Sequence, residues 1–208
     1  DALDYSLKVH IPLLRDYGIG LHVFDNSSTD NTEQIVAKWM NEYQYLSYYK
    51  NERNIGAEAN VERALRHPNS DYVWMIGATY RLPSDGLVYL LKLFENFSYD
   101  AVVFNVANKL TLPSGDYKDP NLLLRDLGAL ATCLSCVVFS KELLSRVDFV
   151  KYQTTNFPHT RILFEGVSRK NCVVRWTQQS SVSVFNEMDF VKSNWSTTGQ
   201  IWEIACEN

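Results

Sequence analysis

The sequence predicts an α/β domain built on a mostly parallel sheet flanked by helices. The main observation is that short apolar runs alternate, along the first half of the chain, with segments whose apolar residues recur at helical spacing. The second observation is that polar loops follow these apolar runs, as they do in strand, loop and helix units. The third is composition: 208 residues, of which 46% are hydrophobic and 21% charged, suit one globular domain.

Each element of the first half follows from a local pattern. A helix is expected at 2–17, where the apolar residues have helical spacing and Gly18 and Gly20 follow as helix terminators. A dense polar loop at 25–32 separates a buried strand from the next helix, and it ends in residues that cap helices. Strands are expected at 21–24, 45–49, 72–76 and 101–106. Helices are expected at 33–42, 57–65 and 85–97.

The second half is less regular and is expected to form a smaller, irregular part of the same domain. Residues 111–119 form a loop that contains Pro and Gly, and no element is assigned to 122–134. Pro158 suits the first position of a helix that runs to residue 164, with Asn156 near its cap. Short strands are expected at 137–139, 173–176 and 181–185, and a helix at 141–147.

Polar loops follow three of the expected strands, after Phe24, Tyr49 and Ile76. Ligands of open α/β sheets bind beyond the carboxyl ends of the strands. These three loops are therefore the expected ligand site.

Charge and hydropathy exclude two classes of protein. Twenty Lys and Arg against 24 Asp and Glu leave a net charge of -4, so the chain lacks the basic footprint of a nucleic-acid-binding protein. The longest nearly uncharged apolar stretch, 128–139, is much shorter than the ~18–20 residues of a membrane span. No charged and then apolar signal segment opens the chain. We therefore expect a soluble cytoplasmic protein without a nucleic-acid partner.

The four cysteines include one close pair, Cys133 and Cys136, in a C-x-x-C motif. A zinc site would need a second pair of ligands at suitable spacing, which the sequence lacks. The surrounding residues are apolar, and the cytoplasm keeps thiols reduced. We expect buried structural thiols here, with a metal or redox role as the alternative.

Three motifs occur in order along the first half. They read Val-Phe-Asp-Asn-Ser-Ser-Thr-Asp-Asn-Thr at 23–32, Arg-Asn-Ile-Gly at 53–56 followed by Asn60, and Asp-Tyr-Val-Trp-Met-Ile-Gly at 71–77. Together they resemble the nucleotide-sugar half of glycosyltransferase family 2. The resemblance implies the GT-A fold, in which a Rossmann-like sheet binds a nucleoside diphosphate sugar, and transfer with inversion at the anomeric carbon.

The resemblance also implies that the two halves of the chain bind different substrates. It covers residues 1–110 well, so these are expected to form the nucleotide-sugar-binding half, and 111–208 the acceptor-binding half of the same GT-A domain. The family's usual first strand, with a Pro-x-Tyr-Asn-like segment, does not precede Asp1. We therefore expect that a segment before Asp1 is missing from this sequence.

Candidate binding residues lie in the first two motifs. Asp25 ends a buried strand, where a carboxylate accepts hydrogen bonds from a uracil imide or from ribose hydroxyls. Ser27 lies in the same loop, and the family's second motif implies that Arg53, Asn54 and Gly56 pack on the nucleoside. The alternative is that these side chains only satisfy loop and helix-cap amides.

For Asp30, in the first of these loops, helix capping is the favoured reading.

The third motif departs from the family at the point where a metal would bind. The family implies an Asp-x-Asp-like group that holds the ribose and a divalent Mn or Mg on the diphosphate. Here the strand is followed by Gly-Ala-Thr-Tyr at 77–80, so Ala78 takes the first acidic position and no metal ligand is expected. Natural metal independence, a degenerate domain and an inactivating Asp→Ala substitution all remain open. The matching neighbours favour the substitution; without it, Arg81 is the nearest cation for the diphosphate.

Inverting transfer needs a general base for the acceptor hydroxyl. The family implies an Asp at a helix start, and the matching stretch at 157–163, followed by Gly166, places His159 there. The helix dipole disfavours the cationic form of a histidine in a first turn, so His159 would stay neutral and able to accept a proton. Packing is the alternative for His159, and Asp126 is the reserve candidate for the base.

The resemblance thus implies a bacterial, inverting glycosyltransferase of polysaccharide biosynthesis. Its donor would be a nucleoside diphosphate sugar, with UDP favoured, and its acceptor a glycan or a lipid-linked unit. A lipid-linked acceptor is compatible with peripheral association at the inner face of the membrane. The rival interpretation is a non-catalytic GT-A-like domain that acts as a binding partner within a glycosyltransferase complex.

Overall fold

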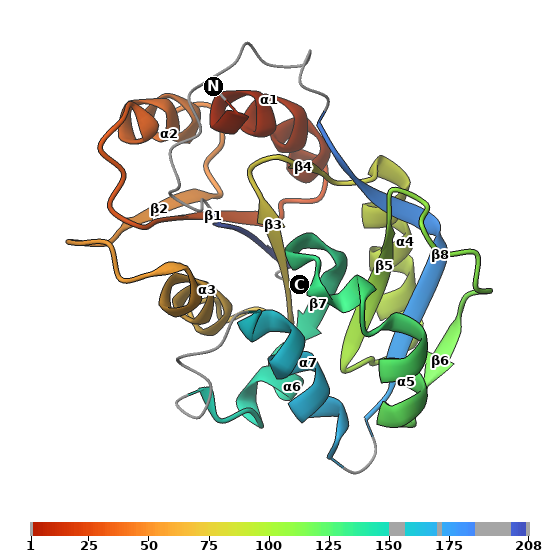
Figure 1. Ribbon diagram of the computed structural model, residues 1–208. Coiled ribbons are helices and arrows are strands. Elements are labelled where there is room, and N and C mark those ends of the chain that lie inside the picture. Colours follow the sequence, from red (N-terminus) through yellow and green to blue (C-terminus); the bar gives the residue numbers. More distant parts are fainter. Residues whose placement is uncertain (1, 150–156, 170–171, 186–200, 207–208) are drawn as a thin grey trace.

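The computed structural model describes residues 2–149, 157–169 and 172–185, and the backbone of 201–206. Nine strands form one sheet in the order β2-β1-β9-β3-β7-β5-β8-β4, and β6 pairs with β8 beside this path (Figure 1). The strands are β1 Gly20–Asp25, β2 Leu46–Lys50, β3 Tyr72–Gly77, β4 Tyr80–Arg81, β5 Ala101–Val106, β6 Gly115–Tyr117, β7 Val137–Ser140, β8 Val174–Val184 and β9 Ile201–Cys206.

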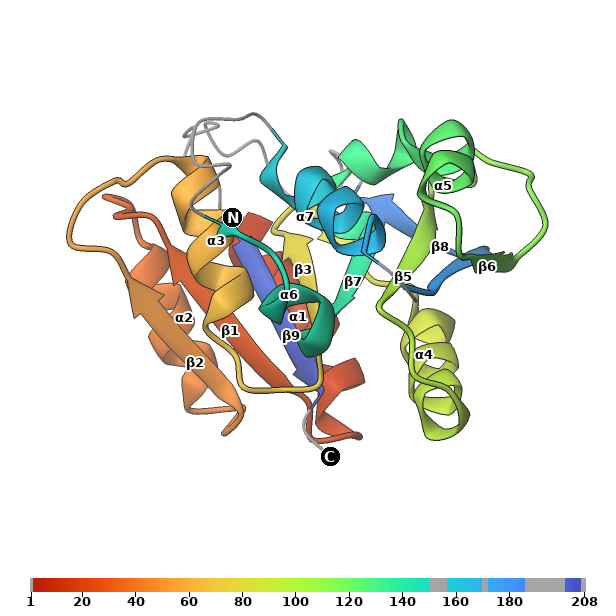
Figure 2. The same cartoon turned by 90° about the horizontal axis from the view of Figure 1, so that it is seen from below.

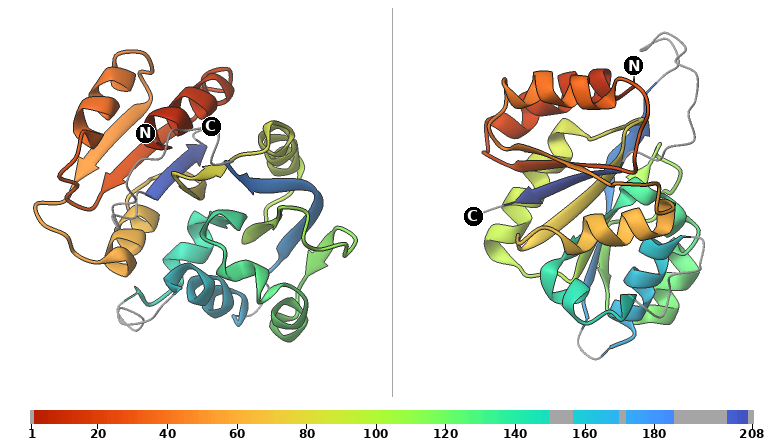
Figure 3. Two further views of the ribbon diagram at one scale, coloured as in Figure 1. Left: turned by 45° about the horizontal axis from the view of Figure 1, so that its top comes forward. Right: turned by 90° about the vertical axis from the view of Figure 1, so that its left-hand side faces the viewer.

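Helices cover both faces of the sheet, as the α/β class requires (Figures 1 and 3). One face carries α1 Ala2–Arg15, α2 Thr32–Met40 and α4 Ser84–Asn96. The other carries α3 Ala57–Arg66, α5 Pro120–Leu127, α6 Lys141–Ser145 and α7 Pro158–Val167. None of the helices that the structure describes is both long and apolar enough to cross a bilayer.

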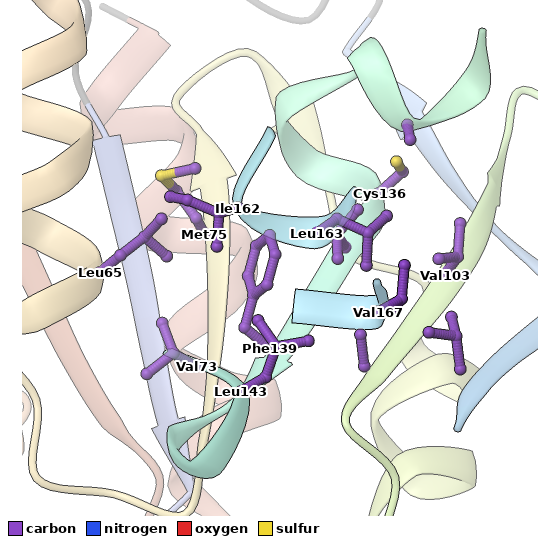
Figure 4. Close-up of a cluster of buried hydrophobic side chains, with 14 of the residues drawn as sticks. Leu65, Val73, Met75, Val103, Cys136, Phe139, Leu143, Ile162, Leu163 and Val167 are labelled. Atoms are coloured by element: carbon purple, nitrogen blue, oxygen red, sulfur yellow. The ribbon is translucent and has the colours of Figure 1, made fainter. Parts of the chain in front are cut away.

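Alternation along the strands feeds two separate apolar cores. In β1, Val23 packs with the cluster under α1 and α2, whereas Phe24 faces the cluster under α3 and α7. Figure 4 shows the second cluster, in which Phe139 of β7 lies among side chains from the facing helices, including Ile162. The sheet is thus packed between two apolar layers, and its carboxyl edge carries polar loops.

The sheet is mixed, which corrects the expectation of a mostly parallel one. Only β1 with β2 and β5 with β8 are parallel pairs among the described strands. However, β9 runs antiparallel between β1 and β3, and β7 runs antiparallel between β3 and β5. The strands β1, β2, β3, β5 and β8 therefore still point the same way, so the polar loops after β1, β2 and β3 open at one edge.

The first half follows the expected elements closely, whereas the second half departs from them. The expected strands at 173–176 and 181–185 are one strand, β8, whose register against β5 shifts between Phe104 and Asn105. The expected loop at 111–119 contains β6. The unassigned 122–134 holds most of α5 and the 3-10 helix η1 Leu130–Thr132, and a second 3-10 helix, η2 Leu134–Cys136, begins at its last residue. The strands β4 and β9 were not expected, and Asn156 lies outside the described residues.

A buried histidine ties α1 to the exit of the β3–β4 turn. His10 Nε2 lies 3.1 Å from the backbone N of Leu82, which can only donate, and Nδ1 lies 3.1 Å from Ser6 Oγ. We therefore assign the proton to Nδ1. Burial, assisted by the charge of Arg81, lowers the pKa of His10 to about 4.

The depressed pKa of His10 predicts acid sensitivity. The unfolded chain takes up a proton near pH 6.5 and the folded chain only near pH 4, so the free energy of unfolding should fall as the pH drops between these values. The loss attributable to His10 should approach about 3 kcal/mol. In the control, His10→Gln, an amide oxygen can still accept from Leu82, and the loss over this range should be smaller. Urea unfolding of both proteins from pH 7.5 to 4 measures the difference; equal pH profiles would contradict it.

Candidate functional site

The carboxyl ends of β1 and β3 lie at the same level of the sheet. Phe24 and Gly77 both pair with Ile201 of β9, one from each side (Figure 2). Neighbouring strands are about 4.8 Å apart, so these two positions are roughly 10 Å apart across the sheet. The next residues, Asp25 and Ala78, therefore begin two loops that open at the same edge.

Asp25 is completely buried at the end of β1. Its Oδ1 accepts a hydrogen bond from the backbone N of Ser28 at 2.7 Å, and its Oδ2 accepts one from the hydroxyl of Tyr48. Burial, and then the hydrogen bond to Asp25, raises the pKa of Tyr48. Both carboxylate oxygens are thus engaged within the chain, so Asp25 shapes the loop after β1.

A cluster of asparagines joins the loops after β1 and β2 to α3. The side-chain oxygen of Asn26 accepts from Asn51 Nδ2 and from the backbone N of Ile55, each at 2.9 Å. Asn26 Nδ2 donates to Asn54 Oδ1, also at 2.9 Å. Asn51 Nδ2 donates in addition to Asn60 Oδ1 of α3 at 2.9 Å. Two consecutive strand ends and a helix start are therefore held together by side-chain amides.

The remaining predicted binding residues line these two loops. Ser27 has a φ of 68° and Gly56 a φ of 88°, both in the left-handed region. The Gly56 N donates to Asn54 Oδ1 at 2.9 Å, and Arg53 is exposed beside them. The structure therefore brings Asp25, Ser27, Asn54 and Gly56 to one edge, with Arg53 at its surface.

The loop after β1 also contains Asp30. Its Oδ1 accepts from the backbone N of Thr32 at 3.0 Å, at the start of α2. The N-cap of α2 is Asn31, which makes no side-chain cap bond, so Asp30 supports the helix start from the residue before the cap and is not the cap itself.

The turn after β3 carries no acidic side chain. Ala78 is half-buried and packs against the apolar cluster under α1, and the turn leads directly into β4 at Tyr80. The family implies a divalent cation here, but no three or more His, Cys, Asp or Glu of the described residues are grouped so as to hold a metal ion. The residues present at this turn do not fit a divalent cation held by carboxylates.

His159 lies in the first turn of α7, with 3% of its surface exposed. Its Nε2 is 3.0 Å from the carbonyl oxygen of Thr132, which can only accept, so we assign the proton to Nε2 and the lone pair to Nδ1. Nδ1 is buried and has no hydrogen-bond partner among the described residues. Burial lowers the pKa of His159, which keeps the imidazole neutral at neutral pH.

The structure does not bring Asp126 to this edge. Asp126 lies on α5 and accepts from Arg125 Nε at 2.7 Å and from the hydroxyl of Tyr117, in β6, at 3.1 Å. The hydrogen bond from Arg125 lowers the pKa of Asp126, which makes it a weaker base. Because β6 pairs with β8, Asp126 stands at the opposite end of the strand order from β1.

Three further residues build the site although they were not expected there from the sequence: Tyr48, Asn51 and Arg63. Arg63 Nη1 donates to Asn51 Oδ1, and its guanidinium lies 5.6 Å from the centre of the Phe24 ring. Asn60 and Arg63 are three residues apart in one helix, and this spacing is a signal that could have placed them on the same face. No pattern in the sequence indicates the bond between Tyr48 and Asp25, since it joins two strands.

Comparisons with known proteins agree with this geometry. The model of the family described as "Glycosyl transferase family 2" matches residues 14–143. The abequosyltransferase RfbV of Salmonella typhimurium is 25% identical over 187 residues, which cover 79% of this chain and 56% of RfbV. An uncharacterized glycosyltransferase of Mycoplasma pneumoniae, the MG060 homolog, is 34% identical over 85 residues, which cover 40% of this chain and 28% of that protein.

A similar solved structure is that of S. aureus TarS 1-349 in complex with UDP. Its TM-score is 0.61 at 16% identity, over 81% of this chain and 52% of TarS 1-349. This likeness supports the fold. The chain spans about half the length of RfbV and of TarS 1-349. Because the family model matches more than half of the chain, and the α/β fold agrees with it, the chain belongs to glycosyl transferase family 2.

Proposed function

We propose that this chain is part of an inverting glycosyltransferase that moves a sugar from a nucleoside diphosphate donor, with UDP as its nucleotide, to a glycan or lipid-linked acceptor. The observation that carries the proposal is the polar edge formed by the level ends of β1 and β3 and the asparagine cluster beside them. The name of RfbV and the UDP in the TarS structure support the reaction and the nucleotide. With a lipid-linked acceptor, the protein would work in bacterial polysaccharide biosynthesis at the inner face of the membrane.

We assign the donor to residues 1–110 and the acceptor to 111–208. The nucleoside would pack on the loop from Arg53 to Gly56, where the missing side chain of Gly56 permits close approach of a ligand. Asp25 would contribute indirectly, because its hydrogen bond to the backbone of Ser28 fixes the loop that carries Ser27. The diphosphate would extend toward the turn at Ala78, where Arg81 is the exposed cation closest in sequence.

His159 is our proposed base for the acceptor hydroxyl. Its neutral state and the unpaired Nδ1 suit proton acceptance. Because Nδ1 is buried, acceptor binding would have to open a path to it. Asp126 stays the reserve candidate, with the weaker basicity that Arg125 gives it.

The turn after β3 favours a second candidate function, a non-catalytic GT-A-like partner domain. An alanine with no neighbouring carboxylate at 79 or 80 leaves the diphosphate charge without the metal that the family implies. Such a domain would bind nucleotide or a partner enzyme without transferring sugar. Nucleotide-dependent thermal shifts, scored together with donor turnover, separate the two candidates.

The role of Asp25 predicts weaker nucleotide binding in Asp25→Ala. Ser28 and Tyr48 would lose their acceptor, and the disturbed loop should weaken UDP binding by ~1–3 kcal/mol, measured by calorimetry on folded protein. The control is Asp30→Ala, which removes a carboxylate from the same loop but only a local bond to Thr32. If Asp25→Ala does not fold, Tyr48→Phe removes one of the two bonds instead. UDP affinity unchanged from the unsubstituted chain would contradict the assignment.

The proposed base predicts different behaviour for two substitutions of His159. In His159→Gln the amide can still donate to Thr132 but cannot take up a proton, so the melting temperature should be kept while turnover falls by ~10²–10⁴-fold. His159→Ala should lose the same turnover and some stability as well. Normal turnover in His159→Gln would show that His159 only packs. The assay uses whichever form of position 78 is active.

The residue at position 78 is expected to decide whether UDP binding depends on a metal ion. We propose that Ala78 stands where an active enzyme has Asp, so the chain should bind UDP equally with Mn or with chelator. Ala78→Asp adds one hard oxygen ligand beside the substrate phosphates and should make UDP binding and donor turnover metal-dependent. Ala78→Asn is the matched control, of the same size without the charge. Full turnover of the unsubstituted chain in chelator would contradict inactivation; no nucleotide binding by any form would favour the partner domain.

A further inference from the structure

The C-x-x-C motif forms a tight turn directly beside the end of β3. Cys133 lies between η1 and η2 and is partly exposed, whereas Cys136 is fully buried at the end of η2. The backbone N of Cys136 donates to the carbonyl of Cys133 at 3.3 Å. Residues at the two ends of such a turn have Cα atoms less than about 7 Å apart, which overlaps the range that a disulfide spans. The Cys136 Sγ lies within hydrogen-bond distance of a backbone acceptor, the carbonyl oxygen of Leu130, at 3.2 Å.

The two thiols lie in different surroundings. The hydrogen bond from Cys136 lowers the pKa of Cys133 to about 6 against the opposing effect of burial, assisted by the Ser135 backbone, Tyr80 and the charge of Lys109. Burial raises the pKa of Cys136 far above that of an ordinary thiol. A partly exposed thiolate beside a buried thiol is the arrangement of a nucleophile and its resolving partner.

We propose that Cys133 and Cys136 are a redox-active dithiol that undergoes thiol–disulfide exchange and whose state positions the turn from Gly77 to Tyr80. The Cys133 thiolate attacks one sulfur of a small-molecule or protein disulfide, forms a mixed disulfide and releases one thiolate. Cys136, whose proton passes to the thiolate released in the first step, attacks the Cys133 sulfur and releases the second thiolate, which takes a proton from water. The dithiol loses two electrons and two protons, and the disulfide becomes two thiols.

Ser135, inside the motif, connects the dithiol to β3. Its hydroxyl accepts from the backbone N of Gly77 at 3.0 Å, and its carbonyl accepts from Trp74 Nε1 at 2.9 Å. Tyr80 helps to lower the pKa of Cys133, and its ring covers Gly77 so closely that a Cβ added to Gly77 would lie 3.1 Å from the ring. A disulfide would redirect the Cys133 sulfur toward Cys136, and because Ser135 lies between the two cysteines and holds Gly77, we expect the turn to adjust. That a change in this turn alters binding of the donor rests on the proposed function.

A metal role for this pair finds no support in the structure. Two thiolates need further ligands to complete a tetrahedral site. Among the residues that the structure describes, no third His, Cys, Asp or Glu joins them in a group able to hold a metal. Redox exchange is therefore the chemistry that the pair can complete by itself.

Alkylation tests the nucleophile. Iodoacetamide labelling of the reduced chain, mapped by peptide, should modify Cys133 with a half-maximal rate near pH 6. Cys172 is the internal control, because burial raises its pKa to about 11. At pH 7 Cys133 should react roughly 10²-fold faster than Cys172, after allowing for its lower intrinsic nucleophilicity. In Tyr80→Phe the half-maximal pH should rise. Labelling of Cys133 no faster than that of Cys172 would overturn the proposal.

Glutathione tests the exchange. In oxidised glutathione the folded chain should lose two hydrogens as a Cys133–Cys136 disulfide; Cys136→Ser should instead retain glutathione on Cys133, and Cys133→Ser should do neither at this site. Absence of the disulfide while circular dichroism shows folded protein would overturn the dithiol.

Calorimetry with UDP tests whether the redox state of the dithiol affects nucleotide binding. The proposal predicts that the reduced and disulfide forms bind UDP with different Kd values. Equal, measurable Kd values for the two forms would overturn this coupling. No UDP binding by either form would refute the proposed function and the coupling, while the exchange data would still decide the dithiol.

Discussion

The hydrogen bonds of the Asn26 side chain are the constraint on which the polar edge depends. An amide removed from water must find partners, since each group left unsatisfied costs about 1–3 kcal/mol. Asn26 meets this demand only when the loops after β1 and β2 approach each other, because its partners are Asn51, Asn54 and the backbone of Ile55. Asn51 also donates to the Asn60 side chain, so the same network fixes the position of α3. The edge is therefore preorganised before any ligand arrives, which lowers the entropy lost on binding.

The sequence predicts local structure well and pairing poorly. Helical spacing and polar loops locate every element up to residue 106 except β4, to within a few residues, because these signals lie within one element. The place of β7 and β9 between strands that all point the other way depends on contacts across the whole chain. With three residues, β6 is too short to show a periodic pattern in the sequence. The two apolar runs that were expected as separate strands belong to one strand, β8, whose register against β5 is irregular.

The candidate site likewise has residues that the sequence predicts and supporting contacts that it does not predict. The family motifs place Asp25 at the end of a strand and Gly56 in the loop after the next strand, and the structure brings them to one edge. Their part in binding stays a prediction. What the motifs omit is how these residues are supported, because Tyr48 and Arg63 act across elements. His159 is at a helix start as expected, but its bond to Thr132 and its burial arise from packing on η1.

The central position of β9 also governs how the molecule is made. Until residues 201–206 have been synthesised, β1 and β3 each present an unpaired edge to the cell. Open strand edges are templates for pairing with other chains, and pairings between distant segments form slowly. The two apolar layers can collapse early, yet the sheet between them stays divided until residues 201–206 have been made. The insertion of β9 between β1 and β3 is therefore the step at which aggregation competes with folding.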